Sequence, residues 1–272
     1  MTAVAKLKAM WNGFWKYRYL LLNLVSRDFK LKYRRSVLGV VWSVLNPLLM
    51  CLVYWAVFSS LMDMRGSGVD NFPVFLMCGQ LLFNFFNEAT FNSMSSVLSA
   101  APLLKKVYIP KYIFPLEKCC FAMVNCVFSF VALLLVMIFT GSSFHLTIFE
   151  ALYPLVTLFF FSLGVGMFLA AATVFFRDIM HIWSVFTTAL LYFSAIFYDP
   201  SQMTFTLGGF NMQQIIALNP IYWYITGFRR TVMWGIPLDR NMFLVCGGCA
   251  VLSMLVGLWT FRKMQDRFVL HI

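Results

Sequence analysis

The chain has 272 residues and a formal net charge of +11 at pH 7; 61% of its residues are hydrophobic, 18% aromatic and 11% charged. Soluble domains carry about 25% charged residues, so this composition excludes an ordinary soluble enzyme or binding domain. A basic excess can also indicate nucleic-acid binding, but in so apolar a chain it is expected to record membrane orientation and contact with anionic headgroups. The composition therefore predicts an all-α polytopic membrane protein that contacts membrane lipids and has no nucleic-acid partner.

Residues 1–35 are predicted to be a cytoplasmic segment that precedes the membrane domain. They lack the apolar core and small-residue cleavage site of a signal peptide. A helix over residues 19–35 would place Leu21, Leu24 and Phe29 on one face and basic side chains on another. Such a helix lies in the inner membrane interface with its basic face toward headgroups or a cytoplasmic partner; a simple basic stop before the first span is the alternative. The residues assigned to this interfacial helix are Arg27, Asp28, Lys30, Lys32, Tyr33, Arg34 and Arg35.

Residues 36–272 are expected to form one transmembrane domain with six helical spans. A helix needs about 20 apolar residues to cross roughly 30 Å of hydrocarbon. On this basis we place the spans at about 40–61, 73–98, 117–139, 151–175, 180–198 and 242–261. An even number of spans puts both termini on the same side of the membrane.

The basic residues indicate which side that is. Nine Lys and Arg residues lie in residues 1–35, four in the connection 101–118, one at Arg177 and three in residues 262–267. Only Arg65, Arg229, Arg230 and Arg240 lie on the other side of the predicted topology. Because cytoplasmic loops are enriched in Lys and Arg, both termini are predicted to be cytoplasmic, in the cytoplasmic (inner) membrane.

The span at 73–98 carries polar residues at every fourth position, which places them along one slowly winding row of the helix. Lipid cannot satisfy such groups, and an ionisable residue in a span usually faces a bundle interior, a pathway or a partner helix. We expect the row to face the translocation path or the interface between two copies; hydrogen bonding between helices and a proton relay are the alternatives. The row comprises Gln80, Asn84, Glu88, Asn92 and Ser96.

Aromatic residues also lie on the spans most suited to line that path, where their ring faces would stack against cyclic groups of a cargo. Aromatic faces combine a large apolar area with little side-chain entropy to lose. The residues assigned to this role are Phe83, Phe86, Tyr192, Phe197 and Tyr198.

The connection 101–118 combines four lysines with apolar side chains between Pro102 and Pro110. A short amphipathic element of this kind can bind in a groove on a partner; a basic loop that only fixes topology is the alternative. In the short connection between the fourth and fifth spans, Arg177 and Asp178 are expected to form a charge pair that also touches the partner.

Residues 200–230 are apolar but interrupted by Gly208, Gly209, Asn219 and Pro220. A seventh full span here would move the C-terminal basic cluster to the outside. We therefore predict two re-entrant half-helices on the outer side, which are allowed where protein shields the irregular backbone.

The chain lacks the residue patterns of a catalytic or metal centre. Its cysteines have no metal-ligand spacing, and none of His145, His181 and His271 is expected deep in a span beside a carboxylate. A phosphate loop of the form G-x-x-x-x-G-K-[ST] is absent. No catalytic residue, metal or cofactor is predicted in this chain. The alternatives from other functional classes are a membrane-embedded glycosyl- or acyltransferase and a channel.

Four motifs, in order along the chain, resemble the membrane subunits of polysaccharide-exporting ATP-binding-cassette transporters. They are RDFKLKYRRSVLG at 27–39 with Trp42 and Pro47, KVYIPK at 106–111 with FPL at 114–116, FFRDI at 175–179 and NPI at 219–221. This family includes exporters of O-antigen, capsule and teichoic acid. The resemblance therefore extends through essentially the whole chain.

The resemblance implies a permease subunit that pairs with a second copy of itself and with two copies of a nucleotide-binding ATPase subunit. ATP and Mg²⁺ would bind to that partner, the cargo would be a lipid-linked polysaccharide, and the outer half-helices would cap the channel. An exporter of a drug or a simple lipid on the same scaffold is the alternative. The residues implied to couple this chain to the ATPase are Leu103, Leu104, Lys105, Lys106, Val107, Tyr108, Ile109, Pro110, Lys111, Arg177 and Asp178.

Overall fold

The computed structural model describes residues 3–61, 71–107, 109–200, 206–207 and 210–268. The long helices are α1 (Ala3–Lys32), α2 (Trp42–Leu61), α3 (Phe72–Ser99), α5 (Ile113–Phe139), α6 (Leu152–Phe175), α7 (Ile179–Phe193) and α10 (Arg240–Met264). The shorter helices are η1 (Gly39–Val41), α4 (Ala101–Leu104), η3 (Leu146–Phe149), α8 (Met212–Ala217), α9 (Pro220–Val232) and η5 (Gln265–Arg267). A two-residue antiparallel pair joins β1 (Thr206–Leu207) to β2 (Phe210–Asn211). The prediction of an all-α chain is confirmed.

Two predicted features lie partly outside the described residues. Tyr108 of the connection 101–118 is one of them. Residues 201–205 and 208–209 of the predicted re-entrant region are the other.

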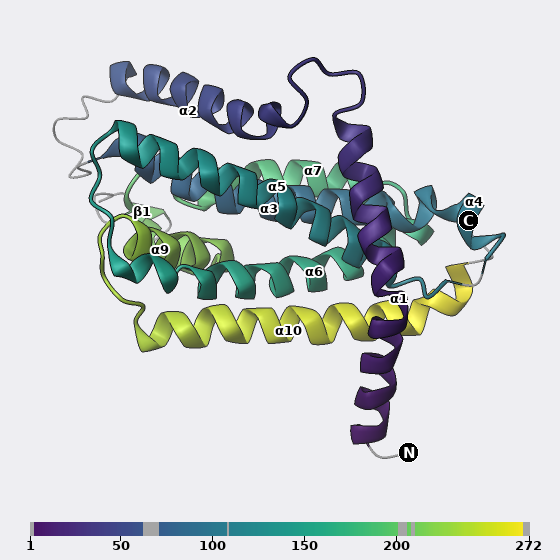
Figure 1. Cartoon of the computed structure of the whole chain (residues 1–272). Helices are drawn as coiled ribbons and strands as arrows, with labels where there is room; N and C mark the ends of the chain where they lie inside the picture. The colour runs from purple at the N-terminus through teal and green to yellow at the C-terminus, as the bar shows by residue number, and fades with distance from the viewer. Residues whose placement is uncertain (1–2, 62–70, 108, 201–205, 208–209, 269–272) are drawn as a thin grey trace.

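The helices form a bundle crossed at one end by α1. α3 lies inside the bundle, in contact with α2, α5, α6, α7 and α9, and α10 packs along α6. Figure 1 shows α1 running across the bundle axis, at the end where α4 and the C-terminal turn also lie. The labels α9 and β1 stand toward the opposite end. We call these the α1 end and the α9 end of the bundle.

Four helical segments of the described residues are long and apolar enough to cross a membrane: Gly39–Val57, Ile113–Phe139, Leu146–Phe175 and Arg240–Arg267. α3 has the length, with 28 residues, but its row of polar side chains lowers its hydropathy. α7 is apolar but has only 15 residues. Several apolar helices thus support a multi-pass membrane protein, and the six-span arrangement stays a prediction.

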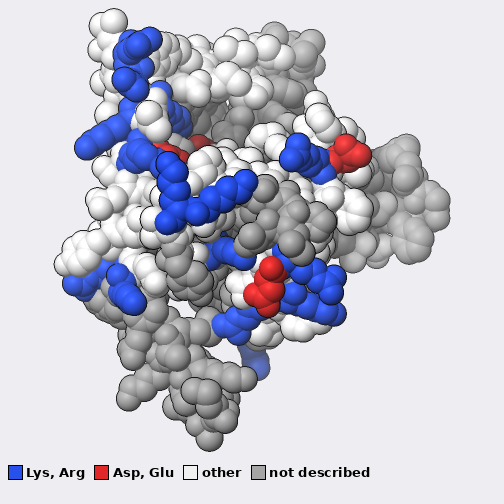
Figure 2. Space-filling view, turned by 90° about the vertical axis from the view of Figure 1, so that its right-hand side faces the viewer, with Lys and Arg blue, Asp and Glu red and all other residues white. Residues whose placement is uncertain are grey.

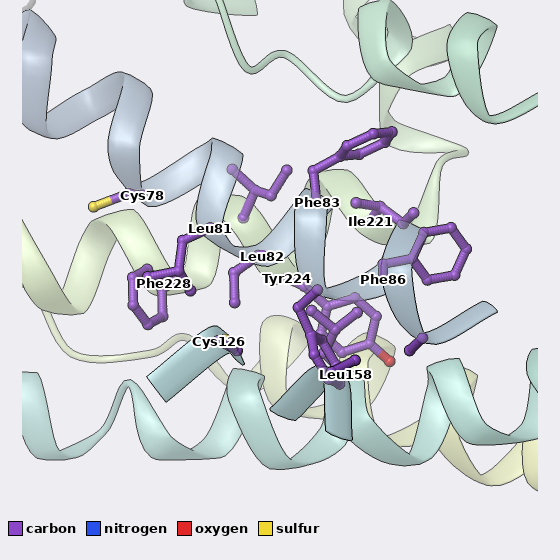
Figure 3. Packing of buried hydrophobic residues seen from close by; sticks show 14 of the residues in the cluster. Cys78, Leu81, Leu82, Phe83, Phe86, Cys126, Leu158, Ile221, Tyr224 and Phe228 are labelled. Carbon is purple, nitrogen blue, oxygen red and sulfur yellow. The ribbon is translucent and has the colours of Figure 1, made fainter. Parts of the chain in front are cut away.

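The buried core is built around α3. Leu82 and Phe86 of α3, Leu158 of α6, and Tyr224 and Phe228 of α9 belong to one cluster of buried apolar side chains (Figure 3). Inside a membrane the lipid tails are as apolar as these side chains, so close packing and hydrogen bonds hold the helices together. The hydroxyl of Tyr224 follows this rule, since it donates to the Cys246 carbonyl on α10 at 2.7 Å.

Glycine allows α6 and α10 to approach with their backbones in contact. A Cβ on Gly257 of α10 would lie 2.1 Å from the Gly164 carbonyl oxygen, and a Cβ on Gly164 would lie 2.3 Å from the Ser253 carbonyl carbon. Real Cβ atoms do not come this close to backbone atoms. Any larger residue at Gly164 or Gly257 would therefore separate the two helices.

Two helices have an end that lies four or more residues from the end of the predicted span. α5 begins at Ile113 rather than at residue 117, because Pro115 falls within its first turn, where proline is tolerated. α7 ends at Phe193, five residues before the end of the predicted span at 198. Its end is followed by Ala195, whose φ of 52° lies in the left-handed region and cannot continue a right-handed helix.

Candidate functional site

The α1 end of the bundle is strongly basic. Figure 2 views this end and shows Lys and Arg side chains spread over it, with few acidic side chains between them. Lys105 and Lys106 after α4, Arg177 after α6, and Arg262 and Lys263 at the end of α10 are all exposed. This end of the molecule therefore offers a positively charged surface.

The connection 101–118 is fixed to α1 by an apolar cluster. Ile109, Ile113 and Phe114 are buried together with Leu24 of α1, and the partly buried Leu103 and Leu104 pack against them. These leucines and Ile109 thus anchor the connection to its own chain. Lys105, Lys106 and Val107 form an exposed tip, and the Val107 side chain is 54% exposed.

Polar contacts fix the same connection at its other end. The Lys111 ammonium donates to the Gln265 carbonyl at 2.5 Å and lies 5.6 Å from the centre of the Phe268 ring. Pro110 is half-buried beside Lys111. The tip is therefore held between α1, the first turn of α5 and the C-terminal turn.

A charged cluster joins α1 to α5. The Lys118 ammonium bonds the Asp28 carboxylate of α1 and lies 3.2 Å from the Glu117 carboxylate. Burial raises the pKa of Asp28, but hydrogen bonds from Lys118 and Arg27 outweigh it, and the pKa lies below its ordinary value. The Phe29 ring stacks on Phe128 of α5 at 5.7 Å. α1 is thus attached to the bundle by ionic and aromatic contacts.

The end of α1 also meets α2 and α3. The Tyr33 hydroxyl bonds the Ser43 hydroxyl at the start of α2. Lys32 lies 3.6 Å from the Glu88 carboxylate of α3. Lys30, Arg34 and Arg35, the remaining basic residues assigned to this region, are exposed.

Arg177 and Asp178 occupy the turn between α6 and α7 at this same end. Both side chains are exposed, and among the ion pairs of the described residues none joins them. The ion pair expected between Arg177 and Asp178 is therefore not formed. Their exposure leaves both free to contact another molecule.

The polar row of α3 faces several different partners. Glu88 accepts a hydrogen bond from Asn125 of α5 at 2.7 Å in addition to its ion pair with Lys32. Ser96 donates to the Ser93 carbonyl of its own helix at 2.7 Å. Asn92 is half-buried. Part of the row is therefore satisfied within the chain, at the junction of α1, α3 and α5.

Gln80 and Asn84 line a small cavity beneath α2. Its other lining residues include Asn46 and Pro47 of α2 and Ser129 of α5. With a volume of about 50 Å³ it has room for a few water molecules but not for a sugar ring. A path for a sugar would therefore need more room than this cavity offers.

The aromatic residues assigned to the path lie in two different settings. Phe83 and Phe86 are buried (Figure 3). The Phe86 ring centre is 5.8 Å from that of Phe161 and 6.2 Å from that of Trp183. Phe83 and Phe86 therefore support the packing of the helices.

At the end of α7 the three other assigned aromatic residues lie close together. Tyr192 is 60% exposed and Phe197 is buried, and the Tyr198 hydroxyl donates to the Tyr192 carbonyl at 2.7 Å. Of this group, Tyr192 offers the most open ring face.

Sequence reasoning missed the residues whose partners are distant in the chain. From the sequence, Lys118 is only one of the four lysines of the connection 101–118, and Asn125 is a single polar residue within the third span; neither indicates its partner. From the sequence, Arg229 is only one of the basic residues on the outer side, and in the structure just 2% of it is exposed. Its position four residues after Ile225 and three before Val232 places it on the apolar face of α9, and this spacing was the available signal.

Comparison with known proteins gives consistent matches along the chain. The family model described as ABC-2 type transporter matches residues 19–233. An O-antigen export system permease protein RfbA from Myxococcus xanthus is 32% identical over 264 residues, which cover 93% of this chain and 95% of the relative. A protein of the same name from Klebsiella pneumoniae is 26% identical over 251 residues, which cover 92% of this chain and 93% of the relative.

Proposed function

The chain belongs to the ABC-2 type transporter membrane family, and we propose on that premise that it is the permease subunit of an exporter of a lipid-linked polysaccharide of the O-antigen type. The observation that carries this proposal is the match over more than nine-tenths of the chain to relatives named O-antigen export system permease. Teichoic acid and capsule exporters, which the sequence motifs equally suggested, have no counterpart among these relatives. A drug or simple lipid as cargo, or a transferase reaction, finds no such support either.

Energy for transport would come from a separate ATPase subunit. The chain has no phosphate-binding loop of the G-x-x-x-x-G-K-[ST] type, so ATP and Mg²⁺ belong to the partner. The surface suited to this partner is the tip formed by Lys105, Lys106 and Val107, with Arg177 and Asp178 near it at the α1 end. Because the tip is anchored to α1 and α5, a movement of the partner can be transmitted through it to these helices, which supports its role as the coupling element.

The proposed topology has six spans with both termini in the cytoplasm. The four long apolar segments, α3 and α7 would supply the spans, and α1 would lie in the inner interface. Its transverse direction at the basic end of the bundle supports this placement, because basic residues mark the cytoplasmic side (Figures 1 and 2). The α9 end would then face outward.

The translocation path would lie between two copies of the chain. Among the described residues, the cavity that Gln80 and Asn84 line is too small for a sugar ring, and this supports a path shared by two permeases. Gln80, Asn84, Glu88 and Asn92 would contribute its polar side. With two ATPase subunits, the complex would contain two copies of each protein.

Co-purification tests the proposal. The permease, expressed together with an ATPase subunit from the same gene neighbourhood, should purify as a complex, and ATP should be hydrolysed only when that subunit is present. Depletion of the permease should cause lipid-linked polysaccharide to accumulate on the cytoplasmic side. A permease that never binds an ATPase, or whose loss leaves polysaccharide export unchanged, would contradict the proposal.

A further inference from the structure

Arg229 is a buried cation whose role differs from that of the basic surface residues. Its guanidinium donates hydrogen bonds to the Phe75 carbonyl of α3 at 3.2 Å, the Ala195 carbonyl at 2.8 Å and the Ile196 carbonyl at 2.9 Å. The guanidinium carbon also lies 3.4 Å from the centre of the Phe75 ring, in a cation–π contact. This side chain thus joins α9 to two other segments, α3 and the residues after α7.

Two of these carbonyls, those of Ala195 and Ile196, lie just after the last residue of α7, Phe193. We call residues 193–196 the broken end of α7, because the left-handed Ala195 interrupts the helix there. A 15-residue helix is about 22 Å long, which is shorter than the roughly 30 Å of a membrane's hydrocarbon core. The last carbonyls of such a helix would end at hydrocarbon depth, where an unpaired backbone group is costly. Arg229 supplies donors to the carbonyls just past this end.

Asn219, the residue before α9, also binds the broken end of α7, from the N-terminal end of α9. Its side-chain amide donates to the Phe193 carbonyl at 3.1 Å and to the Ser194 hydroxyl at 2.9 Å. Between these contacts, Ala195 keeps its left-handed backbone conformation, which is unfavourable for a residue other than glycine. The left-handed conformation of Ala195 is therefore stabilised by Asn219 on one side and by Arg229 on the other.

Gly79 of α3 provides the space for the guanidinium. A Cβ at this position would lie 2.7 Å from the Arg229 Nη2 atom and 3.3 Å from the Ile196 side chain. Any larger residue at this position would therefore displace the guanidinium. The preceding residue, Cys78, is fully buried.

We propose that Arg229 is a positioning residue that holds α9 against α3 and the broken end of α7, and so keeps the α9 end of the permease closed between transport cycles. This inference rests on the proposed function, since only a transporter needs an end that closes and opens. Arg229 does not contact the cargo. Opening would require its three carbonyl contacts to be released together, and it would expose the α3 surface around Cys78.

Thiol labelling of Cys78 tests this proposal in the full-length protein. The membrane-embedded permease is treated with N-ethylmaleimide, and labelling is quantified for each cysteine by peptide mass spectrometry. Arg229→Met should raise the labelling rate of Cys78 by about tenfold, because three buried carbonyls lose a charged donor. Arg229→Lys, which keeps donors and charge, should show a smaller rise.

Two controls separate a local opening from misfolding. Arg230→Met alters the neighbouring arginine, which pairs with Asp239 near the surface, and should leave Cys78 labelling unchanged. Cys119 and Cys126 are buried on α5 and should stay protected in every variant. An unchanged rate at Cys78, or an equal rise at all three cysteines, would overturn the proposal.

Gly79→Ala provides an independent variant that leaves the arginine in place. Its methyl group would push the guanidinium from its site, so Cys78 labelling should rise, and adding Arg229→Met should raise it little further because both changes break one contact. Additive effects would overturn the proposal. Labelling requires neither the ATPase nor the cargo, so a failure to bind an ATPase would contradict the proposed function and leave this result standing.

Discussion

Lys118→Met is expected to be the most costly single substitution where α1 joins the bundle. Lys118 bonds Asp28 of α1 and lies 3.2 Å from Glu117. Asp28 retains Arg27 at 2.9 Å as a second partner, whereas Glu117 is 1% exposed and its Oε1 atom has no hydrogen-bond partner. Loss of the ammonium would therefore leave a buried carboxylate without its counter-charge.

The magnitudes follow from these exposures. Removing one partner of a buried charge pair costs about 3–5 kcal/mol, and removing one of an exposed pair costs about 0–1 kcal/mol. The side chains of Lys118 and Asp28 are 18% and 15% exposed, so we expect Asp28→Asn to cost about 1–2 kcal/mol and Lys118→Met about 3 kcal/mol. Adding Glu117→Gln to Lys118→Met removes the stranded charge and should recover about 2 kcal/mol.

Thermal unfolding of the purified permease measures the total cost, and hydrogen exchange of the peptide covering residues 16–32 measures the release of α1. Wild type should be the most stable, Asp28→Asn and the double variant should be similar to each other, and Lys118→Met should be the least stable. Equal losses in both single variants, together with no recovery on adding Glu117→Gln, would refute the reasoning that the buried carboxylate dominates.

The same contact predicts a pH dependence. Although burial raises the pKa of Asp28, its hydrogen bonds from Lys118 and Arg27 hold the pKa below the ordinary value of 3.8. A lowered pKa contributes stability above the ordinary pKa, and this contribution is lost as the pH falls through the lowered value. The exchange protection that Asp28 gives to α1 should be constant down to about pH 5 and decline below about pH 4, and Asp28→Asn should lack this decline.

Three further predictions concern the basic tip, the polar row and the helix crossing. Replacing Lys105 and Lys106 together by glutamate should weaken binding of the ATPase subunit by about tenfold, more at low salt than at high salt; replacement by methionine should have a smaller effect in the same pull-down. Glu88→Ala should reduce export severalfold, and Glu88→Gln should reduce it less, without loss of membrane insertion; full export by both variants would exclude a functional role. Gly257→Leu should lower the unfolding temperature through a cost of about 1–3 kcal/mol, whereas Gly248→Leu, at a position with open space, should leave it unchanged.

The polar row of α3 illustrates how far sequence reasoning extends. The four-residue spacing identified Glu88 as the unusual charge of this helix before any contact was known. The spacing could not identify Lys32 and Asn125 as its partners, because these residues lie 56 and 37 positions away in the chain and on different helices. A periodic pattern describes one helix face and carries no information on which element covers that face.

The connection 101–118 shows the same limit. Its mixture of lysines and apolar residues predicted a contact element, but Leu103, Leu104 and Val107 cannot be told apart by sequence and were all assigned the same role. Only packing against Leu24 of α1 distinguishes the side chains that anchor the connection from Val107, which remains exposed.

The sequence by itself determined that the chain is helical and apolar and in which order its segments follow, because hydropathy and charge are properties of each segment alone. The tertiary structure decided which charges are paired and which are buried. Asp28 meets Lys118 across 90 residues, and Arg229 reaches Phe75 across 154. Such contacts depend on how helices pack in space. Counted from the sequence only as a charge on the outer side, Arg229 is buried in the structure and joins α9 to α3 and to the residues after α7.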